Sequence, residues 1–257
     1  MAVIGGNLGF FLLKKFGGQG EKDKLSAASY QQRSKIETLL GKDFWERIED
    51  KVVVDFGSGH GHDAVEMARH GARKVIGVDI QERFLQQGRM HAHNAGVTDR
   101  CEFAQRPPEP ADIIVALDSF EHFDDPAAIL RIMSGMLKPD GRVIASFGPT
   151  WFHPFGGHLF SVFPWSHLLF TERAQIRWRS TFKTDGATHF NEVEGGLNQM
   201  TIRRFERLVS ASAFEFESFE AVPIRKLQWL ANPLTREFTT AIVRCTLRLR
   251  DPRIATL

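Results

Sequence analysis

The sequence predicts an α/β fold in which a mostly parallel sheet is covered by helices on both faces. Between residues 51 and 147, short runs rich in Val and Ile alternate with longer amphipathic stretches. Strands and helices that alternate in this way form βαβ units, whose parallel strands are buried on both sides. A glycine-rich turn follows the first of these strands, and Gly41 and Gly71 mark the ends of two predicted helices.

The first 147 residues are expected to hold five strands and four helices. Short β-branched or apolar runs predict strands over 51–55, 74–79, 101–104, 111–117 and 142–147. Helical periodicity and stop signals predict helices over 26–40, 63–70, 81–94 and 126–137. Pro126 stands where the first turn of a helix tolerates proline, and Pro139 to Gly141 form a predicted turn.

The alternation stops after Phe147. Residues 148–200 contain several prolines and two Gly-Gly pairs, and they are too many for a featureless loop in a compact domain. We therefore expect an inserted cap. Beyond it, a helix over 201–212 precedes two strands, 214–221 and 239–249, that are expected to form an antiparallel hairpin at the sheet edge. The predicted organisation is an N-terminal lid or helical segment at 1–44, a core at 45–147 and 201–257, and a cap at 148–200.

Composition and charge exclude several classes of function. The chain has 257 residues, and 33 Lys and Arg against 31 Asp and Glu give a net charge of +2. A general nucleic-acid binder would carry an excess of basic residues, so no nucleic-acid partner is expected. Cys101 and Cys245 are too far apart in sequence for a zinc motif and suggest reduced thiols, which predicts a cytoplasmic protein. No run of 18 apolar residues suggests a spanning helix.

A short apolar run near the N-terminus has two interpretations. Phe10 to Leu13 precede Lys14 and Lys15, which reverses the order of charge and apolar core in a secretory signal. One interpretation is a helix or lid that packs on the domain. The other is attachment of residues 8–16 to a membrane surface as an amphipathic segment.

A glycine-rich turn directly follows the first strand. Asp55 precedes Gly57, Gly59 and Gly61, whose GxGxG spacing differs from that of the dinucleotide-binding fingerprint. Glycines allow a tight turn and let a ligand approach the backbone N–H groups. Asp79 ends the second strand, where an acid of a doubly wound fold accepts hydrogen bonds from ribose hydroxyls. With Asp118, which follows the fourth strand, these residues fall at the carboxyl rim, where such sheets bind ligands.

These motifs resemble those of the class I S-adenosylmethionine-dependent methyltransferases. The resemblance covers residues 45–147 well and 201–250 loosely. The acid and GxGxG of the first motif match Asp55 and the turn at 57–61, and the ribose-binding acid matches Asp79. The remaining matches are Asp112 and Glu121-His122 around the fourth strand, and the turn Leu137-Lys138-Pro139-Asp140-Gly141 before the fifth.

The resemblance implies a Rossmann-like sheet of seven strands, the last one antiparallel, and S-adenosyl-L-methionine as cofactor, with S-adenosyl-L-homocysteine as product. The methionine end would lie over Gly57 to Gly61, the ribose on Asp79, and the adenine beside Ile80. The family often has an acid after the third strand that meets the adenine amino group. Here Gln105 stands in that stretch and could replace it. A cofactor-binding or cyclase-like protein on the same scaffold remains an alternative.

The cap indicates the class of acceptor. Residues 147–190 contain 11 aromatic residues in 44 positions, which favours a small aromatic or hydrophobic acceptor. More than half of these rings are expected to form the core of the cap itself. A lipid or quinone acceptor at a membrane surface fits the same composition. The segment Asp118-Ser119-Phe120-Glu121 lacks the motif of enzymes that methylate exocyclic base nitrogens, which again argues against nucleic acid.

Histidines supply the candidate catalytic groups. His122, His153 and His158 are candidates for a base or a substrate-positioning group, because imidazole accepts protons near neutral pH. A metal site that includes His167 is disfavoured, because the spacing is irregular and no carboxylate accompanies it. We therefore expect a methyltransferase that uses no metal ion and transfers the methyl group to oxygen. Nitrogen or carbon acceptors and the oligomeric state stay open.

Overall fold

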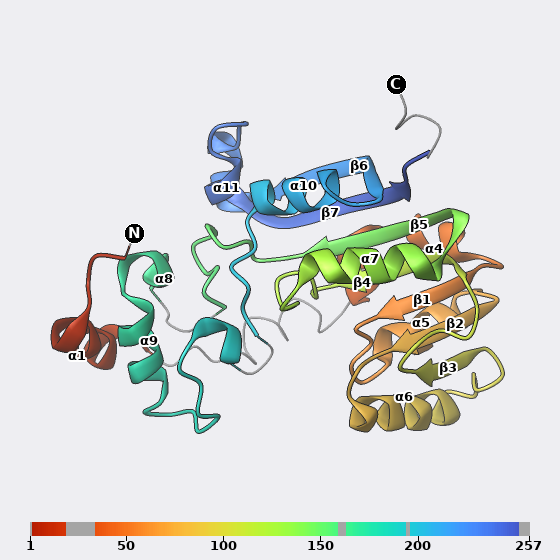
Figure 1. The fold of residues 1–257 in the computed structure, drawn as a ribbon, viewed down its shortest axis with the longest axis horizontal. Coiled ribbons are helices and arrows are strands. Elements are labelled where there is room, and N and C mark those ends of the chain that lie inside the picture. The colour runs from red at the N-terminus through yellow and green to blue at the C-terminus, as the bar shows by residue number, and fades with distance from the viewer. Residues whose placement is uncertain (1, 19–33, 159–162, 194–195, 252–257) are drawn as a thin grey trace.

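The computed structural model describes residues 2–18, 34–158, 163–193 and 196–251. At its centre is a seven-stranded sheet in the order β3-β2-β1-β4-β5-β7-β6 (Figure 1). The strands are β1 (Val52–Phe56), β2 (Lys74–Val78), β3 (Cys101–Ala104), β4 (Ala111–Leu117), β5 (Leu137–Phe147), β6 (Phe214–Pro223) and β7 (Thr240–Leu249). Strands β1 to β5 are parallel, and β7 is antiparallel to both β5 and β6. The predicted sheet, with its antiparallel last strand, is confirmed.

Helices cover both faces of the sheet, as the alternation of elements predicts. The α-helices of the described residues are α1 (Gly6–Phe16), α3 (Lys35–Leu40), α4 (Phe44–Ile48), α5 (His62–Arg69), α6 (Glu82–Asn94), α7 (Pro126–Met136), α8 (Ser166–Leu169), α9 (Glu172–Arg179), α10 (Ile202–Ser210) and α11 (Arg236–Thr239). Two 3-10 helices are η1 (Phe190–Glu192) and η2 (Arg225–Leu230). One buried apolar cluster joins the sheet to α7 and α10, and a second joins it to α3, α4, α5 and α6.

Strand β1 shows why these residues form the centre of the sheet. Val52 and Val54 belong to one apolar cluster and Val53 belongs to the other, because successive side chains of a strand point to opposite faces. All three are buried. A continuous β-branched run is therefore what a central strand covered on both faces requires.

Most predicted boundaries agree with the structure to within about two residues, as is usual for element ends. The exception is β5, which begins at Leu137 rather than at Arg142. Leu137 pairs with Ala111, but the next pair is Arg142 with Ile113, so the predicted turn lies in an irregular stretch of the strand. The first part of the predicted helix over 26–40 lies outside the described residues, and its second part is α3.

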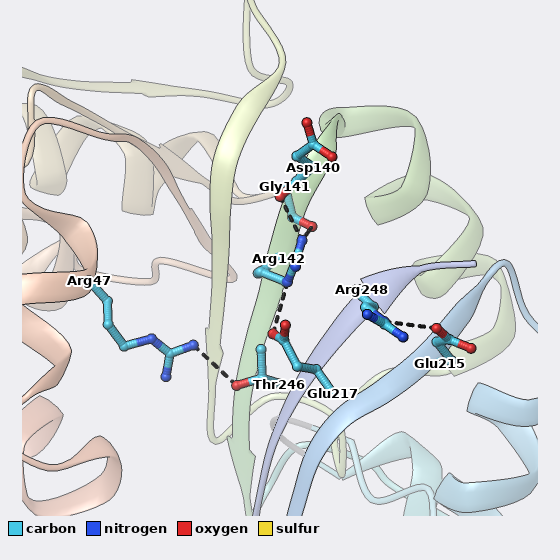
Figure 2. A network of polar contacts seen from close by, with 8 residues as sticks. All are labelled: Arg47, Asp140, Gly141, Arg142, Glu215, Glu217, Thr246 and Arg248. Carbon is cyan, nitrogen blue, oxygen red and sulfur yellow. Dashed lines mark hydrogen bonds and ion pairs between the residues drawn. The ribbon is translucent and has the colours of Figure 1, made fainter. Parts of the chain in front are cut away.

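Charged side chains compensate one another across the strands β5, β7 and β6 (Figure 2). Arg142 and Arg248 are direct partners in the antiparallel register, and like charges in that position repel. Each has a carboxylate at 2.8 Å: Arg142 Nε donates to Glu217, and Arg248 Nε donates to Glu215. These partly exposed pairs offset the repulsion at the edge of the sheet.

The N-terminal helix packs on the cap rather than on the sheet. Figure 1 shows α1 beside α8 and α9, on the far side of the cap from the strands. Leu13 of α1 is buried in a cluster with Phe170 and Trp178 of the cap. The Ile4 amide donates to Leu169 O at 2.9 Å, and its carbonyl accepts from Thr171 N at 2.9 Å.

The aromatic-rich cap is present in the structure. Trp178, Phe170 and Phe190 are buried within its own small clusters, whereas Phe160 lies outside the described residues. Nothing in the structure tests the domain boundaries, which stay predictions. Within the described residues, no helix is both long and apolar enough to cross a membrane.

Candidate functional site

Buried polar atoms gather at the carboxyl rim of the central strands. Six side-chain oxygens at or just beyond the ends of β1, β4 and β5 are buried and have no hydrogen-bond partner within the described part of the chain: Asp55 Oδ2, Ser58 Oγ, Ser119 Oγ, Glu121 Oε2, Ser146 Oγ and Thr150 Oγ1. Buried polar atoms are normally hydrogen-bonded, and each one left without a partner needs an explanation. Their concentration at one edge of the sheet supplies polar atoms that a bound ligand could satisfy.

The glycine turn leaves open space at one position and none at another. Gly57, Gly59 and Gly61 have φ angles of 79°, 48° and 81°, in the left-handed region that favours glycine. A Cβ added to Gly59 would meet nothing within 4 Å. A Cβ added to Gly61 would lie 2.6 Å from the ring of Phe103. Gly59 therefore borders room for a ligand, whereas Gly61 is needed for the packing of α5 against β3.

Asp79 holds the glycine turn to the end of β2. Its Oδ2 accepts a hydrogen bond from Gly59 N at 3.1 Å, and its Oδ1 accepts one from Gln81 N at 2.8 Å. The neighbouring Ile80 is 87% exposed, which is unusual for a large apolar side chain. Gln105 is exposed after β3, the next strand. Ile80 and Gln105 together border an exposed surface that a flat ligand could cover.

Lys35 belongs to the site, although the sequence analysis did not single it out. Its Nζ lies 3.2 Å from Asp63 Oδ2 and 3.2 Å from Asp118 Oδ2. Burial lowers the pKa of Lys35, but the attraction of Asp118 and then Asp63 outweighs it, so the net pKa is raised. Lys35 comes from the first turn of α3 and its partners follow β1 and β4, so only the fold brings them together.

The two buried carboxyl groups of the rim hold their protons unusually tightly. Burial, followed by the charge of Asp63, raises the pKa of Asp55 to about 8, although Lys35 opposes the shift. Burial, followed by the charge of Asp118, raises the pKa of Glu121 to about 8. Glu121 Oε1 accepts a hydrogen bond from Gly148 N at 3.1 Å, which links the end of β4 to the start of the cap.

His122 and His158 come together at the rim. Their ring centroids lie 5.0 Å apart in an edge-to-face arrangement. His122 Nδ1 lies 2.9 Å from the carbonyl oxygen of Gly196, which can only accept. The neutral ring therefore carries its proton on Nδ1, and Nε2 keeps the lone pair that can accept a proton.

His153 has the opposite arrangement. Its Nδ1 accepts a hydrogen bond from Phe155 N at 2.9 Å, so the neutral ring carries its proton on Nε2. Burial, followed by the charge of His167, lowers the pKa of His153 to about 4. Among the described residues, no group of three or more His, Cys, Asp and Glu side chains is arranged to hold a metal ion.

A cavity of about 560 Å³ lies beside the turn that carries His122. Asn198 is one of its lining residues, and its side-chain amide donates to the carbonyls of Phe120 and Phe123 at 2.7 Å. The other lining residues come from that turn, the cap and α10: Asp124, Glu172, His189, Phe190, Asn191, Glu192, Leu197, Gln199 and Arg204. Cap and core thus meet at this cavity, although His122 itself is not one of the residues that line it.

The sequence matches a family described as a methyltransferase domain over residues 26–218. Curated relatives include the ubiquinone biosynthesis O-methyltransferase of Neisseria meningitidis serogroup C, which is 38% identical over 106 residues. That stretch is 38% of this chain and 44% of the relative, so the chain spans less than half the length of the curated relatives it matches.

Solved structures share the fold. An S-adenosylmethionine-dependent methyltransferase from Mesorhizobium loti has a TM-score of 0.51 at 18% identity and covers 78% of this chain and 92% of its own. The cyclase SpnF has a TM-score of 0.53 at 15% identity, with coverage of 80% and 79%. At these identities the likeness describes the fold alone.

Proposed function

Because the chain belongs to the methyltransferase domain family, we propose that it transfers a methyl group from S-adenosyl-L-methionine to a hydroxyl oxygen of a small, hydrophobic aromatic acceptor. The observation that carries this proposal is the set of buried, unpartnered oxygens around an open glycine turn at the sheet rim. The names of the curated relatives favour oxygen as the accepting atom and a phenolic precursor of a quinone as the acceptor.

The charges at the rim suit the zwitterionic methionine end of the cofactor. Asp55 would hold the ammonium group, because its buried Oδ2 has no partner in the described part of the chain. Lys35 would hold the carboxylate, and Asp118, at 3.2 Å, keeps the Lys35 ammonium in place. When bound, the cofactor supplies an electrophilic methyl group on a sulfonium.

The nucleoside half of the cofactor would extend along the neighbouring strand ends. Asp79 would accept hydrogen bonds from the ribose hydroxyls in addition to those that it takes from the backbone. The exposed side chains of Ile80 and Gln105 would border the adenine. The turn from Gly57 to Gly61 would pass beneath the methionine end, with Gly59 bordering the open space.

His122 is the proposed base. His122 Nε2 would take the hydroxyl proton while the oxygen forms its bond to the methyl carbon and the bond from that carbon to sulfur breaks. The hydrogen bond from Nδ1 to Gly196 O fixes the tautomer that this step requires. His158, edge-on to His122, would position the acceptor, and the tautomer of His153 suits a structural role better than that of a base.

A transfer assay with a matched acceptor series tests this proposal. Purified chain is incubated with cofactor labelled in the methyl group and with a catechol that carries a prenyl tail. Control acceptors are its aniline analogue, the same ring without a tail, and the ring with its hydroxyls already methylated. We expect label to enter the tailed catechol most rapidly and the blocked ring not at all.

Two outcomes would contradict the proposal in different ways. If label entered the aniline but not the catechol, the accepting atom would be nitrogen rather than oxygen. Tight cofactor binding without transfer to any acceptor would instead favour the cyclase-like alternative, in which the cofactor stays intact.

A further inference from the structure

Large apolar side chains project from the connection between β6 and β7. Trp229 and Leu234 are 78% and 88% exposed, and Leu230 and Phe238 are also exposed. We call these four residues the hairpin-tip patch. The connection has regular hydrogen bonding, such as Asn232 Oδ1 accepting from Leu234 N at 2.9 Å. An ordered turn that presents a Trp and a Leu outward is characteristic of a contact surface.

The charge around the hairpin-tip patch is positive. No Asp or Glu occurs between Glu220 and Glu237, and Arg225 and Lys226 are exposed in that interval. The carboxylate of Glu237 points inward, where it accepts hydrogen bonds from the backbone N–H groups at the start of α10 at 2.9 and 3.0 Å. Glu206 of α10, which lies beside this connection, is paired with Arg236 at 2.6 Å. The patch therefore presents cations and apolar groups together.

Helix α1 presents a second surface of the same kind. Leu8, Phe11 and Phe16 are between 50% and 64% exposed, and Lys14 and Lys15 are exposed beside them. We call these five residues the α1 patch. The opposite side of the helix is fixed to the cap through Leu13, so the exposed rings cannot fold back onto it. The sequence has no acid before Glu21.

Both patches lie beyond the carboxyl ends of the strands. In Figure 1, α1 and α11 both lie to the left of the sheet, and the arrowhead of β5 points to that side. The ring of Phe238 lies 5.1 Å from that of Phe152 at the start of the cap, so the hairpin tip is tied to the cap. Two segments more than 200 residues apart in sequence thus carry the same surface chemistry at the end that holds the reaction site.

We propose that the hairpin-tip patch and the α1 patch dock the protein on an anionic lipid bilayer. Trp and Lys or Arg are the side chains that anchor proteins at a membrane interface, and a basic surface complements anionic headgroups. Docking brings the carboxyl rim close to the lipid, where hydrophobic acceptors reside. Lipid binding at these patches does not depend on methyl transfer and is measured without it.

Sedimentation with lipid vesicles tests docking directly. Purified protein is mixed with vesicles of phosphatidylcholine alone or of phosphatidylcholine with phosphatidylglycerol. We expect preferential binding to the anionic vesicles that weakens at high salt, because each basic residue near an anionic surface contributes to binding. The double variant W229E/L234E should bind at least about tenfold more weakly, and K14E/K15E should weaken binding less.

The control variant is M90E, because Met90 of α6 is 64% exposed and belongs to neither patch. M90E should bind vesicles like the unchanged protein, and all variants should keep their melting temperature and cofactor affinity. Wild-type protein that stays in the supernatant with anionic vesicles would overturn the proposal. So would a W229E/L234E variant that binds normally, or a dimer in lipid-free buffer that this variant converts to monomer, because the patch would then bind a second copy.

Discussion

The core and the cap are built in different ways. In the core, two large apolar clusters sandwich a hydrogen-bonded sheet, and the glycine turn is held by backbone bonds to Val78 and by Asp79. In the cap, two helices of four and eight residues surround small clusters. Local stability follows the number of buried apolar contacts and paired backbone groups. We therefore expect the core to be the more rigid half of the proposed site and the cap to be the half that adjusts to an acceptor.

This difference separates the part of the site that is proposed to bind the cofactor from the part that is proposed to bind the acceptor. The proposed cofactor residues Asp55 and Asp79 lie on strand ends, whose positions the sheet fixes. His122 lies in the turn after β4, and its Nδ1 is oriented by the carbonyl of Gly196, which belongs to the cap. The proposed base thus lies where the core meets the cap. Substitutions on the two sides should separate stability, cofactor binding and turnover.

The largest effect, on the rate of methyl transfer, is expected at His122, where the core meets the cap. His122→Ala should lower the rate of methyl transfer by about 10²–10⁴-fold, because it removes the proposed base. Cofactor affinity should change little, since the imidazole faces the acceptor. Single-turnover transfer with a parallel cofactor titration measures both.

His153→Ala is the matched variant within the cap. Its ring is committed to the Phe155 amide, so its loss should change the rate far less than the loss of His122. If His153→Ala abolished transfer while His122→Ala did not, the base would belong to the cap and the comparison between the two regions would fail.

The second largest effect separates two glycines of one turn. Gly61→Ala should destabilise the fold by about 2–4 kcal/mol, because the methyl group meets the Phe103 ring and the φ of 81° disfavours alanine. Gly59→Ala faces open space and should cost only about 1–2 kcal/mol, from its φ. Thermal melting measures the first difference.

The cofactor sharpens the contrast between these glycines. It should raise the melting temperature of Gly61→Ala, which keeps the ligand space, but should fail to raise that of Gly59→Ala. Equal stabilisation of both variants would show that the open space at Gly59 is not where the ligand lies.

The contrast also explains how far sequence reasoning reaches. The strand over 111–117 was predictable because burial on both faces demands an apolar run, and Asp55 with its glycines forms a contiguous motif. Lys35 was not predictable, because its partners Asp63 and Asp118 lie 28 and 83 residues away and no local pattern pairs them. The short helices of the cap were not predicted either, because tertiary contacts rather than sequence periodicity define them.

The third largest effect concerns the affinity for the cofactor alone. Asp79→Ala should weaken cofactor binding about ten- to a hundredfold, because hydrogen bonds to a charged acceptor contribute about 1.5–3 kcal/mol. Part of that loss comes from the turn, since Gly59 N loses its bond to Asp79 Oδ2. Asp79→Asn keeps an acceptor oxygen and should lose less. Calorimetric titration that finds unchanged affinity for Asp79→Ala would remove the ribose assignment.

The smallest effect is a change in the pH dependence of stability. Asp55 has a pKa of about 8 in the folded chain because of burial and Asp63, whereas an unfolded aspartate titrates near 4. Between these values the folded state binds more protons than the unfolded state, so stability falls as the pH rises. Asp55→Asn cannot ionise and should lose less stability over this window. Its melting temperature should exceed that of wild type by a few degrees near pH 8 and by less near pH 5.

Glu121→Gln is the control for this measurement, because burial raises the pKa of Glu121 to about 8 as well. Both variants should flatten the pH dependence of melting, since each removes one carboxyl group that the folded state keeps protonated. Only Asp55→Asn should weaken cofactor binding, because the ammonium group of the bound cofactor would favour the ionised carboxylate of Asp55, whereas the amide stays neutral. If both variants bound the cofactor as tightly as wild type, Asp55 would be a structural acid of the rim. The ammonium group would then have to be held by another group at the rim, with Asp118 as the next candidate once Lys35 turns to the carboxylate.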